Sequence, residues 1–225
     1  MRAQPRPPRR VLPWILAAAA AIALTVAGGV WITDRWNADG DHAAPMTSDD
    51  ATATPTFDAD PTGCLGGGSR DAAMVLAAQD QAPHTSNGAA EVAAAVLRWM
   101  HQYPVPSVDD IDQFEQQLVA SSSPYDLASA YADDPNTSGS LVPDGTPFHL
   151  STVPGVWHLE SYSDVDAVVT VGAGLVIDGE LHPTFRMAKT FTLTWADDGW
   201  QFDEASLDRT TEELFAIGTP FTGGC

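Results

Sequence analysis

One basic side chain in the C-terminal half has a position that could bind an anion. Strand alternation places Lys189 on the same face as Met187, Phe191 and Trp195, where an apolar residue is expected. One interpretation is a pocket lined by these residues, in which the lysine faces a bound anion or an acid. The other is a β-bulge between Met187 and Phe191, or an aliphatic stem that carries the ammonium group to solvent at the sheet rim. Bulges are frequent in curved sheets, which favours the second interpretation.

Elsewhere the sequence has no pattern typical of an active site. The six histidines are scattered, and no nucleophile elbow, P-loop, dinucleotide fingerprint or helical metal-ligand pair is present. His101 is expected at a helix C-terminus, where a cation suits the helix dipole. Asp164, Asp166 and Asp203 alternate towards solvent and have no Tyr or His placed to work with them. The sequence therefore predicts a protein that is not an enzyme, with no cofactor and no metal.

The first 32 residues predict a membrane anchor. Residues 1–10 are basic, and residues 11–32 carry no charge. At ~1.5 Å per residue the uncharged segment forms a helix of ~33 Å, enough to cross a bilayer core. The arginines place the N-terminus in the cytoplasm and the rest of the chain outside the cell membrane. A cleaved signal peptide is the alternative, because Thr25-Val26-Ala27 resembles a cleavage site, although the apolar run continues beyond it.

The remainder of the chain is strongly acidic. The whole chain has ten Lys and Arg against 30 Asp and Glu, a formal net charge of −20; four of the arginines lie in residues 1–10, so residues 33–225 carry 6 − 30 = −24. Such a surface repels phosphate backbones, so no nucleic-acid binding is expected. Residues 33–63 are polar, rich in Pro, Thr and Asp, and without periodicity, which predicts a disordered spacer. Residues 64–225 then form the extracytoplasmic domain.

Both cysteines lie in the exported part of the chain. Thiols there are usually oxidised, and an even count predicts one disulfide between Cys64 and Cys225. Two free or intermolecular thiols are the alternative. A disulfide would tie the start of the folded domain to the last residue.

Helical periodicity comes first in the domain, and strand alternation follows. Helices are expected over 89–101, from Ser107 with Asp110 as its capping partner, and from Ser123 as a cap. A closing helix is expected after Thr210. Strands with alternating apolar residues are expected over 148–152, 156–162, 165–177, 184–195 and 200–205.

The turns and glycines indicate how the strands are joined. Asp178-Gly179 and Asp198-Gly199 are typical of hairpin turns, and Gly172 and Gly174 indicate a bend in a long strand. Helices followed by antiparallel strands make an α+β domain. The helices must cover one face of the curved sheet, which would form a cone with a pocket.

This order of elements, with two long central strands and a final hairpin from Trp195 to Trp200, resembles the NTF2-like (cystatin-like) fold. Residues 89–104 and 185–201 carry the resemblance. With the anchor and spacer, the chain is similar to extracytoplasmic proteins of actinobacterial conjugative and integrative elements, which share the design of type IV secretion scaffolds.

The resemblance implies a function without catalysis. The expected role is a membrane-anchored assembly subunit of a conjugation-type apparatus in the cell envelope. Its expected partners are other envelope proteins of that apparatus, and a homo-oligomer is left open. The alternative is an extracytoplasmic module that binds a lipid or a small molecule.

Overall fold

The computed structural model describes residues 58–197 and 199–225. The predicted tail, the anchor over 11–32 and most of the predicted spacer lie outside the described residues. Within those ranges, no helix is both long enough and apolar enough to cross a bilayer. Pro61 and Gly63 are buried, so ordered structure begins before Cys64.

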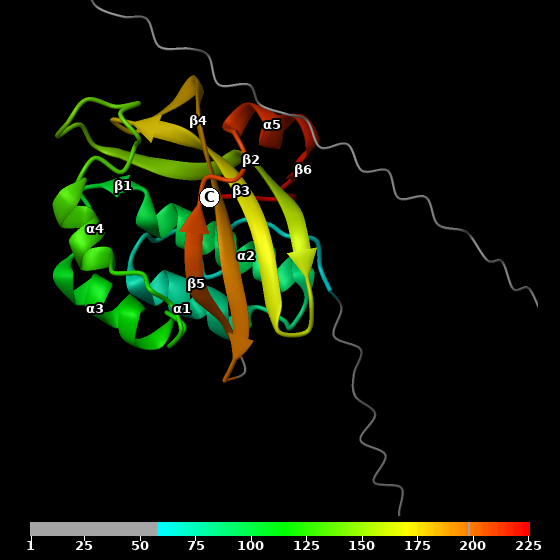
Figure 1. Ribbon diagram of the computed structural model, residues 1–225. Helices are drawn as coiled ribbons and strands as arrows, with labels where there is room; N and C mark the ends of the chain where they lie inside the picture. The colour runs from blue at the N-terminus through cyan, green and yellow to red at the C-terminus, as the bar shows by residue number, and fades with distance from the viewer. Residues whose placement is uncertain (1–57, 198) are drawn as a thin grey trace, which may run out of the picture. The chain divides into compact units, whose positions relative to one another are not determined.

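Four helices precede the main strands of the described part: α1 (Ala72–Gln81), α2 (Ser86–Met100), α3 (Val108–Gln117) and α4 (Leu127–Asp133). α2 matches the first predicted helix, and every residue from Gly88 to Met100 is buried. It is enclosed because α1 packs on one side and the sheet on the other (Figure 1). α2 is therefore the centre of the core.

The capping predictions for α3 and α4 have different outcomes. Ser107 caps α3 as predicted, since its hydroxyl accepts from the Asp110 backbone N–H at 3.2 Å. α4 begins three residues later than predicted, because Asp126, and not Ser123, accepts from the Ser129 N–H at 2.9 Å. The Ser123 hydroxyl instead donates to the backbone carbonyl of Asp203.

The strands form one antiparallel sheet in the order β1-β2-β3-β4-β5, with β6 paired to β2. The two strands expected over 148–152 and 156–162 are one strand, whose register shifts between Ser151 and Gly155. Pro154 lies within this irregularity, where a missing N–H is tolerated. The strand bounds are β1 (Gln102–Tyr103), β2 (Phe148–Tyr162), β3 (Asp166–Ile177), β4 (Glu180–Ala196), β5 (Gly199–Ser206) and β6 (Thr219–Pro220).

The hairpin predictions are confirmed at one turn and corrected at the other. Asp178 and Gly179 have φ of 49° and 85°, as expected for the β3–β4 turn. At the β4–β5 turn Ala196 pairs with Gly199, and the positive φ falls on Asp197. The turn is therefore one residue earlier than predicted, because Gly199 already belongs to β5.

The inner face of the sheet follows the predicted alternation. Five residues of β3 face α2 and are fully buried or nearly so, namely Ala167, Val169, Val171, Ala173 and Leu175. Phe191 and Leu193 of β4 continue this face, and Trp195 lies opposite Trp200 as expected. The helices and this face of the sheet share a single core.

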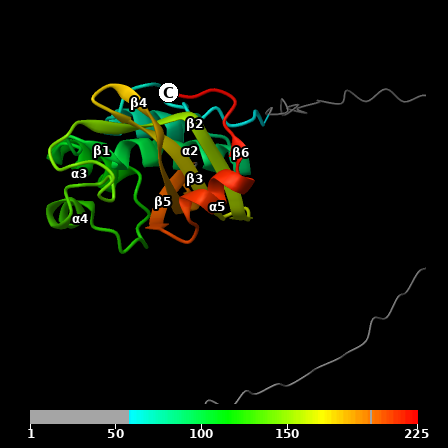
Figure 2. The same cartoon turned by 90° about the horizontal axis from the view of Figure 1, so that it is seen from above.

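The outer face of the sheet carries α5 (Thr211–Ile217), which lies against β2, β3 and β4 (Figure 2). The predicted capping box is present between Thr210 and Glu213. A Cβ on Gly172 would lie 2.7 Å from the Phe215 ring, so the glycine allows α5 to approach β3. The predicted bend is present as a register shift after Gly174. This α+β arrangement of helices on a strongly curved antiparallel sheet is consistent with the NTF2-like fold.

The outer face also holds a bidentate ion pair. Both carboxylate oxygens of Glu160 accept from the Arg209 guanidinium, at 2.8 and 2.6 Å, and Oε1 also accepts from the Thr170 hydroxyl at 2.7 Å. Hydrogen bonding to Arg209 is the main cause that lowers the pKa of Glu160 from 4.5 to about 2. The folded state therefore binds this proton more weakly than the unfolded state does.

Glu160→Gln is expected to reduce the free energy of unfolding at neutral pH by about 1 kcal/mol, because the pair is partly exposed and screened. A depressed folded-state pKa contributes stability above the unfolded value, and that contribution is lost as the pH falls from about 4.5 to about 2. Urea unfolding of both proteins across this range should show the gap closing. A gap that stayed constant down to pH 2 would contradict the assignment. Glu180→Gln, at an exposed residue, is the control.

Candidate ligand-binding site

A cavity of about 530 Å³ opens between α4, the loop that follows it, and β4. The pairing of β4 with β5 ends at Thr190 opposite Ser206, so the part of β4 before Thr190 is not covered by β5. The residues from Arg186 to Lys189 line the cavity along this uncovered part. Its volume falls within the range of small-molecule sites, ~300–1,000 Å³.

The walls of the cavity are mainly apolar. Met100 ends α2, Leu127 and Tyr131 belong to α4, Met187 comes from β4, and Leu207 precedes α5. The Tyr131 hydroxyl donates to the Met100 carbonyl at 3.1 Å. That bond satisfies the phenol, and desolvation raises its pKa. Tyr131 therefore acts as an apolar wall and not as an acid.

Lys189 is on the inner face of β4, in regular register with β3. Lys189 pairs with Val171, and no register shift separates Met187 from Phe191. The β-bulge, one of the two forms of the favoured interpretation, is therefore wrong, because strand alternation is unbroken there. The other form, a stem that reaches solvent at the sheet rim, is not contradicted, since Lys189 is half-buried. Both Lys189 and Met187 line the cavity.

The other two residues grouped with Lys189 by alternation lie outside the cavity. Phe191 is fully buried in the core beyond it. Trp195 lies further along β4, where its ring stacks on His84 with 4.0 Å between centroids. The uncovered part of β4, which borders the cavity, ends before Phe191. Met187 and Lys189 therefore line the cavity, whereas Phe191 and Trp195 do not.

The ammonium group of Lys189 has no partner within the described residues, which offer it no hydrogen bond and no carboxylate at ion-pair distance. Burial lowers its pKa by desolvation. A cation that is partly desolvated and unpaired carries an energetic cost. Lys189 is also the only lysine of an acidic chain.

His101 faces the same cavity in a neutral form. As predicted it ends α2, where its backbone N–H bonds to the Leu97 carbonyl. Its ring Nδ1 lies 2.8 Å from the Thr137 carbonyl, which can only accept, so Nδ1 carries the proton. Desolvation is the main cause that lowers the pKa of His101 to about 4. The predicted cation at the helix end is therefore wrong, since burial disfavours the charge.

The second ring nitrogen of His101 is an unused acceptor. Nε2 is buried and has no hydrogen-bond partner among the described residues. With Nδ1 protonated, Nε2 carries the lone pair. The positive charge of Lys189 is near enough to contribute to the low pKa of His101, after desolvation. The cavity thus combines a cationic donor and a neutral acceptor.

The rim of the cavity holds charged and apolar side chains. The Arg186 guanidinium lies 4.5 Å from the Phe215 ring centroid, so a cation–π contact holds it towards α5. Asp134 supplies a carboxylate on the opposite rim. Leu207 and Leu141 expose 74% and 37% of their surfaces there, leaving an apolar entrance.

No protein-family model, characterised protein or solved structure matches the chain. Asp164, Asp166 and Asp203 are absent from the residues that line the cavity. Asp166 instead accepts from the Thr194 hydroxyl, and Asp203 from the Ser122 hydroxyl.

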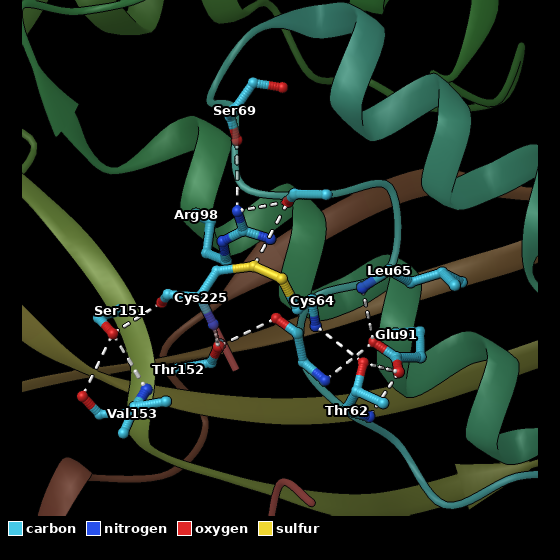
Figure 3. The surroundings of a disulfide bond; sticks show 12 residues. Thr62, Cys64, Leu65, Ser69, Glu91, Arg98, Ser151, Thr152, Val153 and Cys225 are labelled. Carbon is cyan, nitrogen blue, oxygen red and sulfur yellow. Dashed lines mark hydrogen bonds between the residues drawn. A yellow bond between two sulfur atoms is a disulfide. The ribbon is translucent and has the colours of Figure 1, made fainter. Parts of the chain in front are cut away.

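The predicted disulfide joins Cys64 to Cys225, with 5.4 Å between their Cα atoms (Figure 3). The Thr152 hydroxyl donates to the Gly63 carbonyl and accepts from the Cys225 N–H, both at 3.0 Å. The Ser151 hydroxyl donates to the Cys225 carbonyl at 2.7 Å. Both ends of the domain are therefore bonded to β2 as well as to each other.

Two charged side chains of α2 hold the segment around Cys64. The Glu91 carboxylate accepts from the backbone N–H groups of Thr62 and Gly63 and from the Thr62 hydroxyl. Arg98, which is fully buried, donates through Nη2 to the Gly67 and Ser69 carbonyls (Figure 3). We call Glu91, Arg98 and the disulfide the terminal clamp.

Proposed function

We propose that the domain binds a small amphipathic molecule in the cavity between α4 and β4. The observation that carries the proposal is an unpaired, partly desolvated Lys189 inside an apolar cavity of about 530 Å³. A bound polar group would remove the cost of that unpaired cation, and the apolar walls would enclose the rest of the ligand. In this proposal the protein is a binding module and not an enzyme.

The test is binding of the dye 1-anilinonaphthalene-8-sulfonate to the full chain, measured by fluorescence. Ala130→Trp is expected to fill the cavity and weaken binding more than about tenfold, or 1.4 kcal/mol. Ala132→Trp is the matched control, because Ala132 is an exposed residue of the same helix that does not line the cavity. Equal binding by both variants, with near-UV circular dichroism unchanged, would reject the cavity as the site.

A second candidate function is assembly into a conjugation-type envelope apparatus. The observation in its favour is the apolar rim of Leu207 and Leu141, which suits an apolar side chain of a partner protein. The sheet is a weaker docking surface, because α5 covers part of its outer face and Thr170 and Thr190 bond to each other there. The NTF2-like resemblance is the other support for this role.

Crosslinking of the full chain in its native host tests the assembly role. Subunits of a transfer apparatus should be recovered with the wild type and lost with Leu207→Asp. Ile217→Asp, at an exposed residue of α5 outside the cavity, is the control. Recovery of the bait alone would reject the assembly role and leave ligand binding as the function.

A further inference from the structure

Two polar groups of residues that line the cavity lack a hydrogen-bond partner in the part of the chain that the structure describes. One is a donor and the other an acceptor, so each needs a different group of a bound ligand. The Lys189 ammonium can only donate, and within the described residues it finds no acceptor. The neutral His101 ring offers Nε2, which can only accept and has no donor among those residues. A ligand that satisfies both must present an acceptor oxygen to Lys189 and a hydroxyl or N–H group to His101, and an anionic oxygen would also compensate the lysine charge.

We infer that the ligand is a hydroxylated amphipathic carboxylate, with its carboxylate on Lys189 Nζ, its hydroxyl donating to His101 Nε2, and its aliphatic part against Met100, Leu127 and Met187. The inference rests on the proposed binding function and names the ligand class of the same cavity. A plain fatty acid would leave Nε2 unpaired. A ligand whose donor is an ammonium group would be repelled by Lys189.

The charges around the site are compatible with an anion. The chain is acidic overall, but charges more than ~8 Å apart are largely screened at physiological salt. Asp134, on the rim, is the carboxylate among the lining residues, and it makes no ion pair with Lys189. Arg186, at the opposite rim, adds a second positive charge. The carboxylate is therefore drawn to the β4 side of the cavity.

Three probes of equal chain length separate the contacts, namely decanol, decanoate and 3-hydroxydecanoate. Displacement of the dye from the full chain gives the affinity of each. Decanoate is expected to bind about tenfold more tightly than decanol, because of the charge-assisted bond to Lys189. The 3-hydroxyl group should add about another fivefold through His101.

Two variants assign each gain to its residue. Lys189→Met keeps an apolar stem and should reduce decanoate to the affinity of decanol. His101→Asn keeps a donor for the Thr137 carbonyl but lacks Nε2, so it should lose only the gain from the hydroxyl group. As a readout independent of folding in the variant, the ¹⁵N resonance of wild-type His101 Nε2 should shift with 3-hydroxydecanoate and not with decanoate.

The outcomes distinguish this inference from the proposed function. If the three probes bind equally and Ala130→Trp still blocks them, the cavity binds ligands but the hydroxy-acid inference is wrong. If decanoate and 3-hydroxydecanoate bind equally and Nε2 does not shift, the His101 contact is wrong and the inference is overturned. If no probe binds, the proposed function fails together with the inference.

Discussion

Replacing Cys64 and Cys225 by serine is expected to lower the free energy of unfolding by about 5 kcal/mol. The disulfide spans a sequence separation of 161 residues and restricts the unfolded chain. Without it the unfolded chain gains the conformational entropy that closing so long a loop removes, which stabilises the unfolded state. Few small domains have more than about 5–15 kcal/mol to lose. The double variant should therefore unfold at a much lower urea concentration than the wild type does.

The control for the disulfide prediction is chemical reduction. Wild-type protein in excess dithiothreitol should unfold at the same urea midpoint as the double serine variant, and the variant should not respond to the reductant. A difference below about 1 kcal/mol between oxidised wild type and variant would show that the hydrogen bonds of the terminal clamp suffice without the disulfide.

Glu91→Ala is expected to lower the free energy of unfolding by about 3 kcal/mol. The carboxylate is 7% exposed, and its removal leaves the backbone N–H groups of Thr62 and Gly63 without their acceptor. Desolvation lowers the pKa of Arg98, and the negative charge of Glu91 partly opposes that effect. The substitution removes this negative charge. A buried charge that loses its counter-charge is costly.

Glu91→Gln removes the charge and keeps one of the two acceptor oxygens. The Thr62 N–H bonds to Oε1 and the Gly63 N–H bonds to Oε2, so glutamine keeps an acceptor for only one of them and places an NH₂ donor against the other. Its cost should therefore lie between those of wild type and alanine. Urea unfolding measures each cost, and hydrogen exchange of the amides of residues 62, 63 and 65 locates it. Equal losses for alanine and glutamine would show that one remaining acceptor oxygen contributes nothing without the charge and the second oxygen.

Much of the fold could be predicted because its signals are local. The alternation in β3, the cap at Ser107 and the capping box at Thr210 each depend on neighbours within a few residues. Periodicity did not predict α1, because its buried side chains include the small residues Ala72 and Ala78 and so give only a weak apolar stripe. The cap of α4 was misplaced because Ser123 bonds to β5, which is distant in sequence.

The candidate site was less predictable because it depends on where elements end. Alternation singled out Lys189, but the cavity exists because β5 stops opposite Thr190 and leaves the earlier part of β4 uncovered. The neutral state of His101 follows from burial beneath the loop that carries Thr137, which no spacing reveals. Glu91 did leave a signal, since it is a lone acid within an alanine-rich helix.

The terminal clamp also determines how the domain carries mechanical load. A pulling force applied between residues before Cys64 and the C-terminus passes from Cys64 through the sulfur–sulfur bond to Cys225. The covalent link is nearly inextensible, so the 160 residues between the cysteines bear almost none of the tension. The sheet and its cavity are therefore mechanically bypassed, and ligand affinity should not change under a force applied between these two points.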